Sequence, residues 1–256
     1  MPALFIGHGS PMNVIEDNGF TRRLRKLGQE LSRPKAILVV SAHWETGGTR
    51  VLTHKQPETM YDFYGFPDAL YATTYPAPGA PAEARLAIEA LKGISASSTE
   101  DRGLDHGAWA VLYHLFPKAD IPVFQVSLDR KISFQEHFAV GKMLSSLREK
   151  GIMILGSGNI VHNLGRYHPD VDAEPFDWAV EFDDKIKALL VKRDMAGLIH
   201  IEKSGAELAK LAMPTAEHYL PLLYVLGASD AKDALSFPYE GMQNASMSMR
   251  MVLLNR

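Results

Sequence analysis

Short, continuous runs of apolar residues predict the strands of a buried sheet. Four such runs, at residues 3–6, 36–40, 121–126 and 152–155, each end in small or polar residues. They lack the strict alternation of apolar and polar positions that is typical of a sheet with one face in water. We therefore expect a central sheet that is covered on both faces.

The segments between these runs predict helices. Residues 17–31 and 133–149 have apolar positions three and four residues apart, with polar residues opposite them. Four further helices are predicted, at residues 81–91, 108–115, 175–191 and 205–212. Strands that alternate with helices indicate an α/β fold in which helices flank a mostly parallel central sheet.

The C-terminal segment has a different pattern. Residues 246–252 alternate between polar and apolar side chains, which predicts a half-exposed, antiparallel strand at one edge of the sheet. The predicted fold class is therefore α/β, with a mostly parallel sheet and an antiparallel C-terminal strand.

Length and composition favour a single domain over residues 1–256. Of the 256 residues, 46% are hydrophobic, which is enough to bury one large core. Residues 54–81 form a long predicted loop, rich in Pro, Gly, Tyr and Phe, that we expect to cover a pocket rather than to link two domains. For its aromatic residues, packing within the loop is slightly favoured over lining the pocket; these residues are Tyr61, Phe63, Tyr64 and Phe66.

Charge and hydropathy limit the partners. A formal net charge of -3 gives no reason to expect nucleic acid or an anionic membrane as a partner. The longest apolar runs are far shorter than the roughly 20 residues of a membrane span, and the N-terminal residues lack the pattern of a signal peptide. A cytoplasmic location is expected, whereas the sequence leaves the oligomeric state open.

The chain contains no cysteine and ten histidines, so a metal site must rely on histidine, carboxylate or carbonyl ligands. His8 and His43 follow predicted strands directly, and His162 lies shortly after another. Because ligands bind beyond the carboxyl ends of strands in open α/β sheets, we expect these imidazoles at one rim. Imidazole binds iron, copper and zinc. The sequence pattern therefore leaves two interpretations open: a shared metal site, or three isolated structural histidines.

His218 is more ambiguous when the residues are considered alone. Thr215 is predicted to cap a short helix that has His218 in its first turn. Glu217 is an alternative metal ligand, but adjacent helical residues point in different directions, so we expect only one of the two to reach a metal. A structural role for His218 is the favoured interpretation at this point.

His106 is a candidate proton carrier. It follows Asp105, which is predicted to orient it, and precedes Gly107, which permits close backbone approach. A histidine that lies near a metal without binding it is suited to carry protons, because its ordinary pKa is about 6.5. The alternative is a polar turn before a helix. The remaining histidines are predicted to be structural: His54, His114, His137, His168 and His200.

Five motifs occur in order along the chain: Gly7-His-Gly-Ser-Pro11, Ser41-Ala-His-Trp44, Asp105-His-Gly107, Ser157-Gly-Asn-Ile-Val-His-Asn163 and Pro214-Thr-Ala-Glu-His-Tyr-Leu-Pro221. Together they resemble the DOPA 4,5-dioxygenase branch of the class III extradiol ring-cleaving dioxygenases, which is related to the catalytic subunit of protocatechuate 4,5-dioxygenase. Gly65-Phe-Pro67 and Tyr75-Pro-Ala-Pro-Gly79 match the intervening loop of the family. The resemblance covers nearly the whole chain.

This resemblance implies a metal site formed by His8, His43 and His218. It also implies that His162 is the catalytic histidine and a fourth ligand in resting, zinc-filled forms, and that His106 contacts substrate. The implied cofactor is Fe(II) for turnover, with Zn(II) as an occupant of the resting site. The wider superfamily uses two histidines and a carboxylate. In this chain His218 matches the position of that carboxylate, which leaves the native metal open between iron and zinc.

The implied reaction is extradiol (4,5) cleavage, with O2, of a catechol such as DOPA, so the expected partners are a small catechol and dioxygen. His162 is expected to take a proton from the catechol and to return it later. Two alternatives are a zinc-dependent hydrolase, with Glu217 as general base, and a non-enzymatic metal-binding relative. The presence of all five histidines argues against the second alternative.

Overall fold

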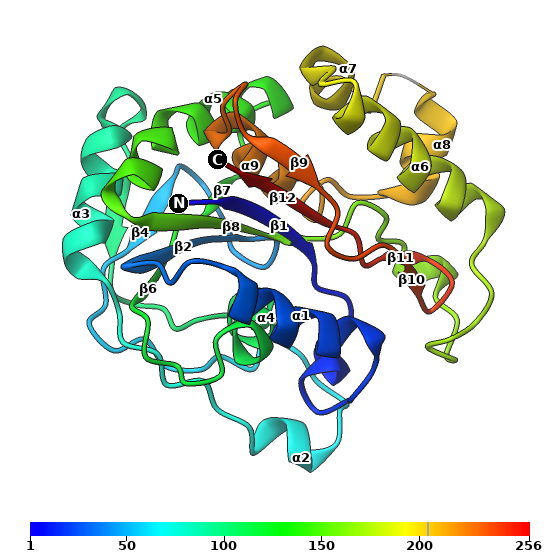
Figure 1. Cartoon of the computed structure of the whole chain (residues 1–256), viewed down its shortest axis with the longest axis horizontal. Helices are drawn as coiled ribbons and strands as arrows, with labels where there is room; N and C mark the ends of the chain where they lie inside the picture. Colours follow the sequence, from blue (N-terminus) through cyan, green and yellow to red (C-terminus); the bar gives the residue numbers. More distant parts are fainter. Residues whose placement is uncertain (204) are drawn as a thin grey trace.

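A six-stranded sheet forms the centre of the computed structural model, which describes residues 1–203 and 205–256 (Figure 1). Neighbouring strands pair in parallel from β6 to β1, whereas β12 pairs antiparallel with both β1 and β9. The predicted fold class, a single α/β domain with a mostly parallel sheet, is confirmed. In spatial order the strands are β6 (Val123–Gln125), β2 (Ala36–Ser41), β8 (Ile152–Gly158), β1 (Ala3–Gly7), β12 (Met251–Asn255) and β9 (Ala234–Ser236).

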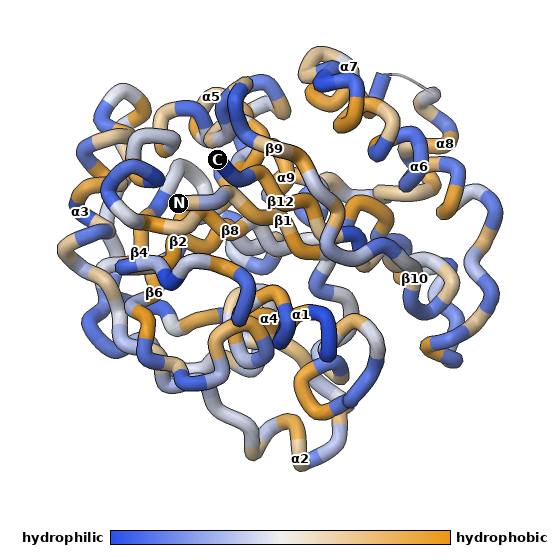
Figure 2. The backbone as a smooth tube through the Cα atoms, viewed as in Figure 1, coloured by the Kyte–Doolittle hydropathy of each residue, from blue (hydrophilic) through white to orange (hydrophobic). Residues whose placement is uncertain are grey.

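Helices cover both faces of this sheet. Ala3 and Phe5 of β1 pack into one apolar cluster, whereas Leu4 and Ile6 pack into the other. In Figure 2 the strands of the sheet are coloured mostly as hydrophobic, and the hydrophilic residues lie mainly toward the outside of the molecule. The first cluster contains residues of α3 (Pro81–Ala90), α5 (Phe134–Leu144), α6 (Asp177–Val191) and α9 (Leu220–Ala228), and the second contains residues of α1 (Gly19–Glu30) and α4 (His106–Leu115).

The antiparallel C-terminal strand is confirmed, but its predicted place at an exposed edge is wrong. β12 begins at Met251, is mostly buried, and has β9 outside it. The alternating polar residues before it are buried as well, because Ser248 donates to Asp183 over 2.6 Å and Arg250 forms an ion pair with the same carboxylate. Alternation along residues 246–252 therefore reflects a buried polar network rather than contact with water.

Five of the six predicted helices lie within two residues of their predicted limits. The sixth, predicted over residues 133–149, is divided between α5, which ends at Leu144, and the 3-10 helix that follows it. α4 begins at His106, because Asp105 accepts a hydrogen bond from Ala108 N and caps the helix. α9 was not predicted, since all its residues are apolar and buried and give no amphipathic pattern. The remaining elements are η1 (Pro11–Val14), β3 (Glu45–Thr46), β4 (Arg50–Leu52), α2 (Asp68–Tyr71), η2 (Lys92–Ile94), β5 (Ser97–Thr99), β7 (Leu128–Asp129), η3 (Ser145–Lys150), η4 (Leu164–Arg166), α7 (Met195–Ile199), α8 (Ala206–Ala212), β10 (Met242–Gln243) and β11 (Met247–Ser248).

No helix in the part of the chain that the structure describes combines the length and the apolar character needed to cross a bilayer. The long loop predicted over residues 54–81 lies between β4 and α3. It follows the protein surface and contains only the short helix α2 (Figure 1).

We predict that Gly28→Ala destabilises the packing of α1 against α4. A Cβ atom at Gly28 would lie 1.8 Å from the carbonyl oxygen of Leu115, so the two helices would have to separate. Overpacking typically costs about 1–3 kcal/mol, and a contact this short with a backbone atom belongs at the upper end of that range. The gain in helix propensity is only about 1 kcal/mol, so urea unfolding should show a net loss of about 2 kcal/mol in the free energy of unfolding.

Gly47→Ala is the matched control, because the nearest atom to its new Cβ would be 3.7 Å away in the Lys131 side chain. Equal stability of the two variants would show that the close contact between the helices does not constrain the fold.

Candidate metal centre

Three parallel strands end at the same level and bring His8 and His43 together. Gly7 at the end of β1 pairs with Gly158, and Ser41 at the end of β2 pairs with Ser157. His8 N then donates to the carbonyl of Gly158 over 2.9 Å. The rim predicted from the positions of the strand ends is therefore present.

His218 reaches this rim from a turn that precedes α9. Its carbonyl oxygen accepts a hydrogen bond of 2.9 Å from Asn159 N. A Cβ atom at Gly158 would lie 2.1 Å from that oxygen, so glycine is needed for this approach. The predicted helix capped by Thr215 is wrong: residues 215–219 form bends and turns, and the Thr215 hydroxyl donates to Glu217 instead.

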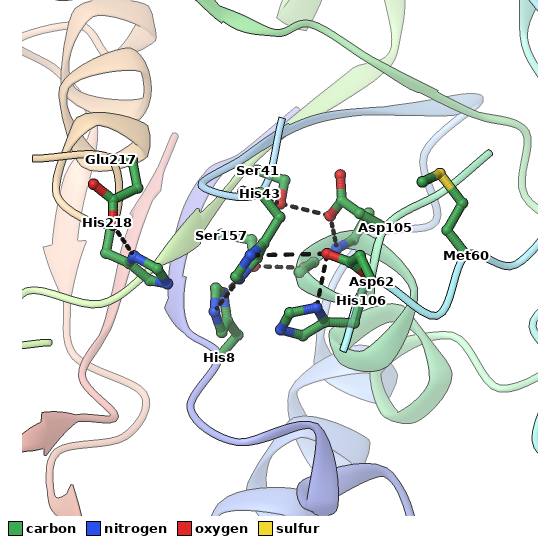
Figure 3. Close-up of polar contacts among 12 residues, drawn as sticks. His8, Ser41, His43, Met60, Asp62, Asp105, His106, Ser157, Glu217 and His218 are labelled. Carbon is green, nitrogen blue, oxygen red and sulfur yellow. Dashed lines mark hydrogen bonds and ion pairs between the residues drawn. The ribbon is translucent and has the colours of Figure 1, made fainter. Parts of the chain in front are cut away.

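The three imidazoles fit a single divalent cation. Their ligand atoms lie within 4.8 Å of one another, and the Nε2 atoms of His8 and His43 are 3.1 Å apart (Figure 3). Two nitrogens bound to one ion at about 2.0–2.1 Å, at angles between 90° and the tetrahedral value, are about 2.9–3.4 Å apart. The buried Nε2 of His218 has no hydrogen-bond partner, which is the condition expected of a metal ligand.

The opposite ring nitrogens fix two of the tautomers. Ser157 Oγ donates its only proton to the carbonyl of Gly107, so it accepts from His8 Nδ1 at 2.9 Å. Glu217 Oε1 lies 3.0 Å from His218 Nδ1 and accepts from it. In both histidines Nε2 therefore carries a lone pair, and the Glu217 contact has the form of the carboxylate–histidine pairs found behind metal ligands.

Burial keeps these three imidazoles uncharged. Desolvation, followed by the neighbouring histidines, lowers the pKa of His8 and of His218 well below 6.5. Burial and the nearby His106 lower the pKa of His43 to about 4, against the opposing effect of Asp105 and Asp62. All three rings are thus neutral near pH 7, as metal ligation requires.

His106 is oriented by Asp62, not by Asp105 as predicted. Asp62 Oδ1 accepts from His106 N at 2.8 Å, and its Oδ2 lies 3.0 Å from His106 Nδ1 (Figure 3). Asp105 is fully buried and instead accepts hydrogen bonds from Ser41 (2.6 Å) and Gln125 (2.9 Å). Although burial opposes ionisation, the hydrogen bonds with His106 lower the pKa of Asp62 to about 2. No sequence motif pointed to Asp62, because its partner lies 44 residues away.

Gly107 lets the start of α4 lie directly against the strand ends, which confirms the close backbone approach predicted for this residue. A Cβ atom there would lie 2.3 Å from Ser41 Oγ and 3.0 Å from His43 Cδ2. His106 consequently lies beside His43, with ring centroids 3.9 Å apart.

His162 lies beside the three-histidine group but belongs to a different candidate set, with Glu217 and His218. Its ring stacks on that of His218, with centroids 3.5 Å apart and an interplanar angle of 9°. Burial lowers the pKa of His162 to about 4, and the Glu217 carboxylate partly opposes this shift.

A cavity of about 700 Å³ opens onto all five histidines. Of the aromatic residues in the long loop, Phe63 and Phe66 line this cavity, which is the less favoured of the two sequence predictions. Tyr61 packs within the loop as predicted and donates to the carbonyl of Thr73, whereas Tyr64 is 92% exposed. A cavity of this size suits a small organic ligand.

Comparison with known proteins agrees with this geometry. Residues 2–250 match the family described as the catalytic LigB subunit of aromatic ring-opening dioxygenase. The chain belongs to this LigB family. The family resemblance and the oxygen-incorporating, ring-cleaving enzyme class predicted from the sequence are thereby confirmed.

Individual relatives of the LigB family cover almost the full chain. An Escherichia coli (strain K12) protein named 4,5-DOPA dioxygenase extradiol is 48% identical, over 97% of this chain and 93% of its own length. A protein of the same name from Beta vulgaris is 35% identical, over 95% of this chain and 92% of its own length. A crystal structure of an uncharacterized protein from Escherichia coli K12 covers both chains completely, with a TM-score of 0.87 and 44% identity.

We predict that Glu217→Gln weakens metal binding without unfolding the protein. The amide keeps the shape of the side chain but loses the charge behind His218 Nδ1, and changes of this kind typically lower metal affinity by about 10–100-fold. Competition with a chelator measures the affinity. Glu45→Gln is the matched control, because it removes a neighbouring exposed carboxylate but not the hydrogen bond to His218. Equal affinities for the two variants would contradict this role of Glu217.

A second prediction follows from the lowered pKa of the ligands. At pH 6.5, three imidazoles with the ordinary pKa would release about 1.5 protons on binding a metal. Here the pKa of His43 is about 4 and those of His8 and His218 lie well below 6.5, so metal binding should release almost no protons. Calorimetry in buffers of different ionisation enthalpy counts these protons. Release of more than one proton would show that the rings are charged before binding.

The same shifts make the metal-free protein less stable in acid. Between about pH 6.5 and pH 4 the unfolded chain binds protons that the buried rings do not, so the free energy of unfolding falls as the pH falls through this range.

Proposed function

We propose that this protein is a metal-dependent extradiol dioxygenase that opens the ring of a catechol such as DOPA by 4,5-cleavage with O2. The observation that carries this proposal is the convergence of three uncharged imidazoles, those of the buried His8 and His218 and the half-buried His43, in a member of the LigB family. The relatives named for DOPA support catechol as the substrate class.

We assign Fe(II) to turnover and Zn(II) to a resting form, with the same three histidines as ligands. Bound Fe(II) would supply a redox-active centre through which the oxidation of the ring could be coupled to the reduction of dioxygen, whereas redox-inert zinc would not. Both oxygen atoms of O2 enter the ring-opened product. The three-histidine set itself is compatible with either metal.

His162 is the proposed acid and base. As a neutral ring it takes a proton from a catechol hydroxyl, and Glu217 stabilises the charged imidazolium that results. The His162 and His218 rings are nearly parallel, with centroids 3.5 Å apart and an interplanar angle of 9°. Because an imidazole nitrogen directs its lone pair within the plane of the ring, two stacked rings do not point at a common ion. His162 would therefore have to tilt to act as a fourth ligand.

His106 is proposed to hydrogen-bond the bound substrate. Asp62 accepts a hydrogen bond from the backbone N–H of His106 and also lies against the Nδ1 atom of His106. The Nε2 atom of His106 is therefore the one left for a ligand in the cavity. Glu217, the general base that a zinc hydrolase would need, is already hydrogen-bonded to His218 and Thr215, which argues against that alternative.

The test is anaerobic loading of the metal-free protein with Fe(II), followed by a panel of catechols and measurement of oxygen uptake. We expect oxygen consumption together with the yellow ring-opened product. Zinc-loaded protein should bind catechol but consume no oxygen. If no catechol supports oxygen uptake after full Fe(II) loading, the proposed function is wrong.

We further predict that His162→Ala retains metal but loses turnover by about 10²–10⁴-fold, the usual contribution of a positioned acid or base. Metal content and oxygen uptake are measured on the same sample. His200→Ala, which removes an exposed imidazole from the end of α7, is the matched control. Loss of the metal from His162→Ala would make His162 chiefly a ligand.

A further inference from the structure

The cavity above the histidines contains little positive charge. Among the described residues that line it, Glu217 is the only aspartate, glutamate, lysine or arginine. The remaining wall combines the histidines with small polar groups and an apolar surface, to which Met12, Phe63, Phe66 and Met247 contribute. A ligand that enters this cavity therefore meets one carboxylate and no lysine or arginine.

Two nearby arginines do not change this balance. Arg102 lies behind His43, where it donates to the His43 carbonyl and to the buried Asp105, both over 3.0 Å. Its charge is thus neutralised by Asp105. Arg166 lies between two lining residues, Gly165 and Tyr167, but its own side chain is exposed and does not line the cavity.

The charges around the histidines also disfavour a second anion. Asp62 lies 3.0 Å from His106 and Glu217 lies 3.0 Å from His218, so two carboxylates flank the ligand group. A divalent cation and a doubly deprotonated catechol offset each other and leave these two carboxylates uncompensated. An additional carboxylate on the substrate would have no cationic partner, and unpaired charges are costly to bury.

We propose that the native substrate is a catechol whose ring substituent carries no net negative charge, such as an alkyl, alkylamine or zwitterionic amino-acid chain, and not a lone carboxylate. This inference rests on the proposed catechol dioxygenase function. A cavity of about 700 Å³ is large enough to take the substituent as well as the ring. The substituent then lies among apolar side chains and near Glu217, where an amine gains a partner and a carboxylate does not.

The experiment compares catechols that differ in the charge of a short chain: dopamine, 4-ethylcatechol, DOPA and 3,4-dihydroxyphenylacetate. Turnover is measured as kcat/KM with Fe(II)-loaded protein, and affinity as Kd with zinc-loaded protein, which needs no turnover. The carboxylate should be at least about tenfold worse than 4-ethylcatechol in both measurements, in line with the discrimination that an unpaired buried group produces. Dopamine should equal or exceed 4-ethylcatechol, and zwitterionic DOPA should fall between dopamine and the carboxylate.

Equal or better binding of 3,4-dihydroxyphenylacetate would overturn the inference and leave the dioxygenase assignment intact. Absence of turnover with every catechol would instead reject the proposed function. Because the affinities are measured with zinc-loaded protein, the two failures are distinguishable.

Leu164→Arg provides an independent test. Leu164 lines the cavity but is 62% exposed, so an arginine can replace it without being buried in the core. We expect the affinity for the carboxylate, relative to 4-ethylcatechol, to rise by about fivefold at most, since a partly exposed charge pair contributes no more than this. Added salt should reduce the gain. Leu164→Gln, of similar size but uncharged, should show no gain, and an equal effect of both variants would contradict the inference.

Discussion

Three imidazoles that lie within ligand distance of one another must remain uncharged, and the rest of the site follows from this constraint. In water, histidines this close together could take up protons, repel one another and move apart. Burial lowers the pKa values of His8, His43 and His218, so these rings stay neutral near pH 7. Ser157 and Glu217 each accept a hydrogen bond from the Nδ1 atom on the far side of a ring, which leaves the inner nitrogens of His8 and His218 free to bind a cation.

Backbone packing, more than side-chain chemistry, sets the positions of the rings. The paired ends of β1, β2 and β8 place two of the histidines, and glycines at 107 and 158 let the start of α4 and the turn before α9 come into contact with those ends. In related iron sites a carboxylate is the third ligand and supplies a negative charge. Here negative charge is present too, but it lies behind the histidines and beside their neighbours. Asp62 and Glu217 provide it without entering the proposed ligand set.

Different parts of this arrangement were predictable to different degrees. Strand ends are visible in sequence as apolar runs followed by small or polar residues, so His8, His43 and the parallel sheet could be inferred from local pattern. His218 could be assigned only by resemblance to a family, because a turn before a uniformly apolar helix gives no periodic signal. Asp62 could not be identified at all, since its role depends on a contact made across the fold. Asp105 was misassigned for a related reason: its neighbour in sequence is not its partner in space.

The central claim is that one cation is shared by His8, His43 and His218. The most direct test is a crystal structure of protein loaded with one equivalent of zinc, with the ion located by its anomalous scattering. The account predicts a single ion bonded to three Nε2 atoms at about 2.0–2.1 Å, with His162 still stacked on His218. An ion held instead by His43, Asp62 and His106, the neighbouring candidate group, would contradict it.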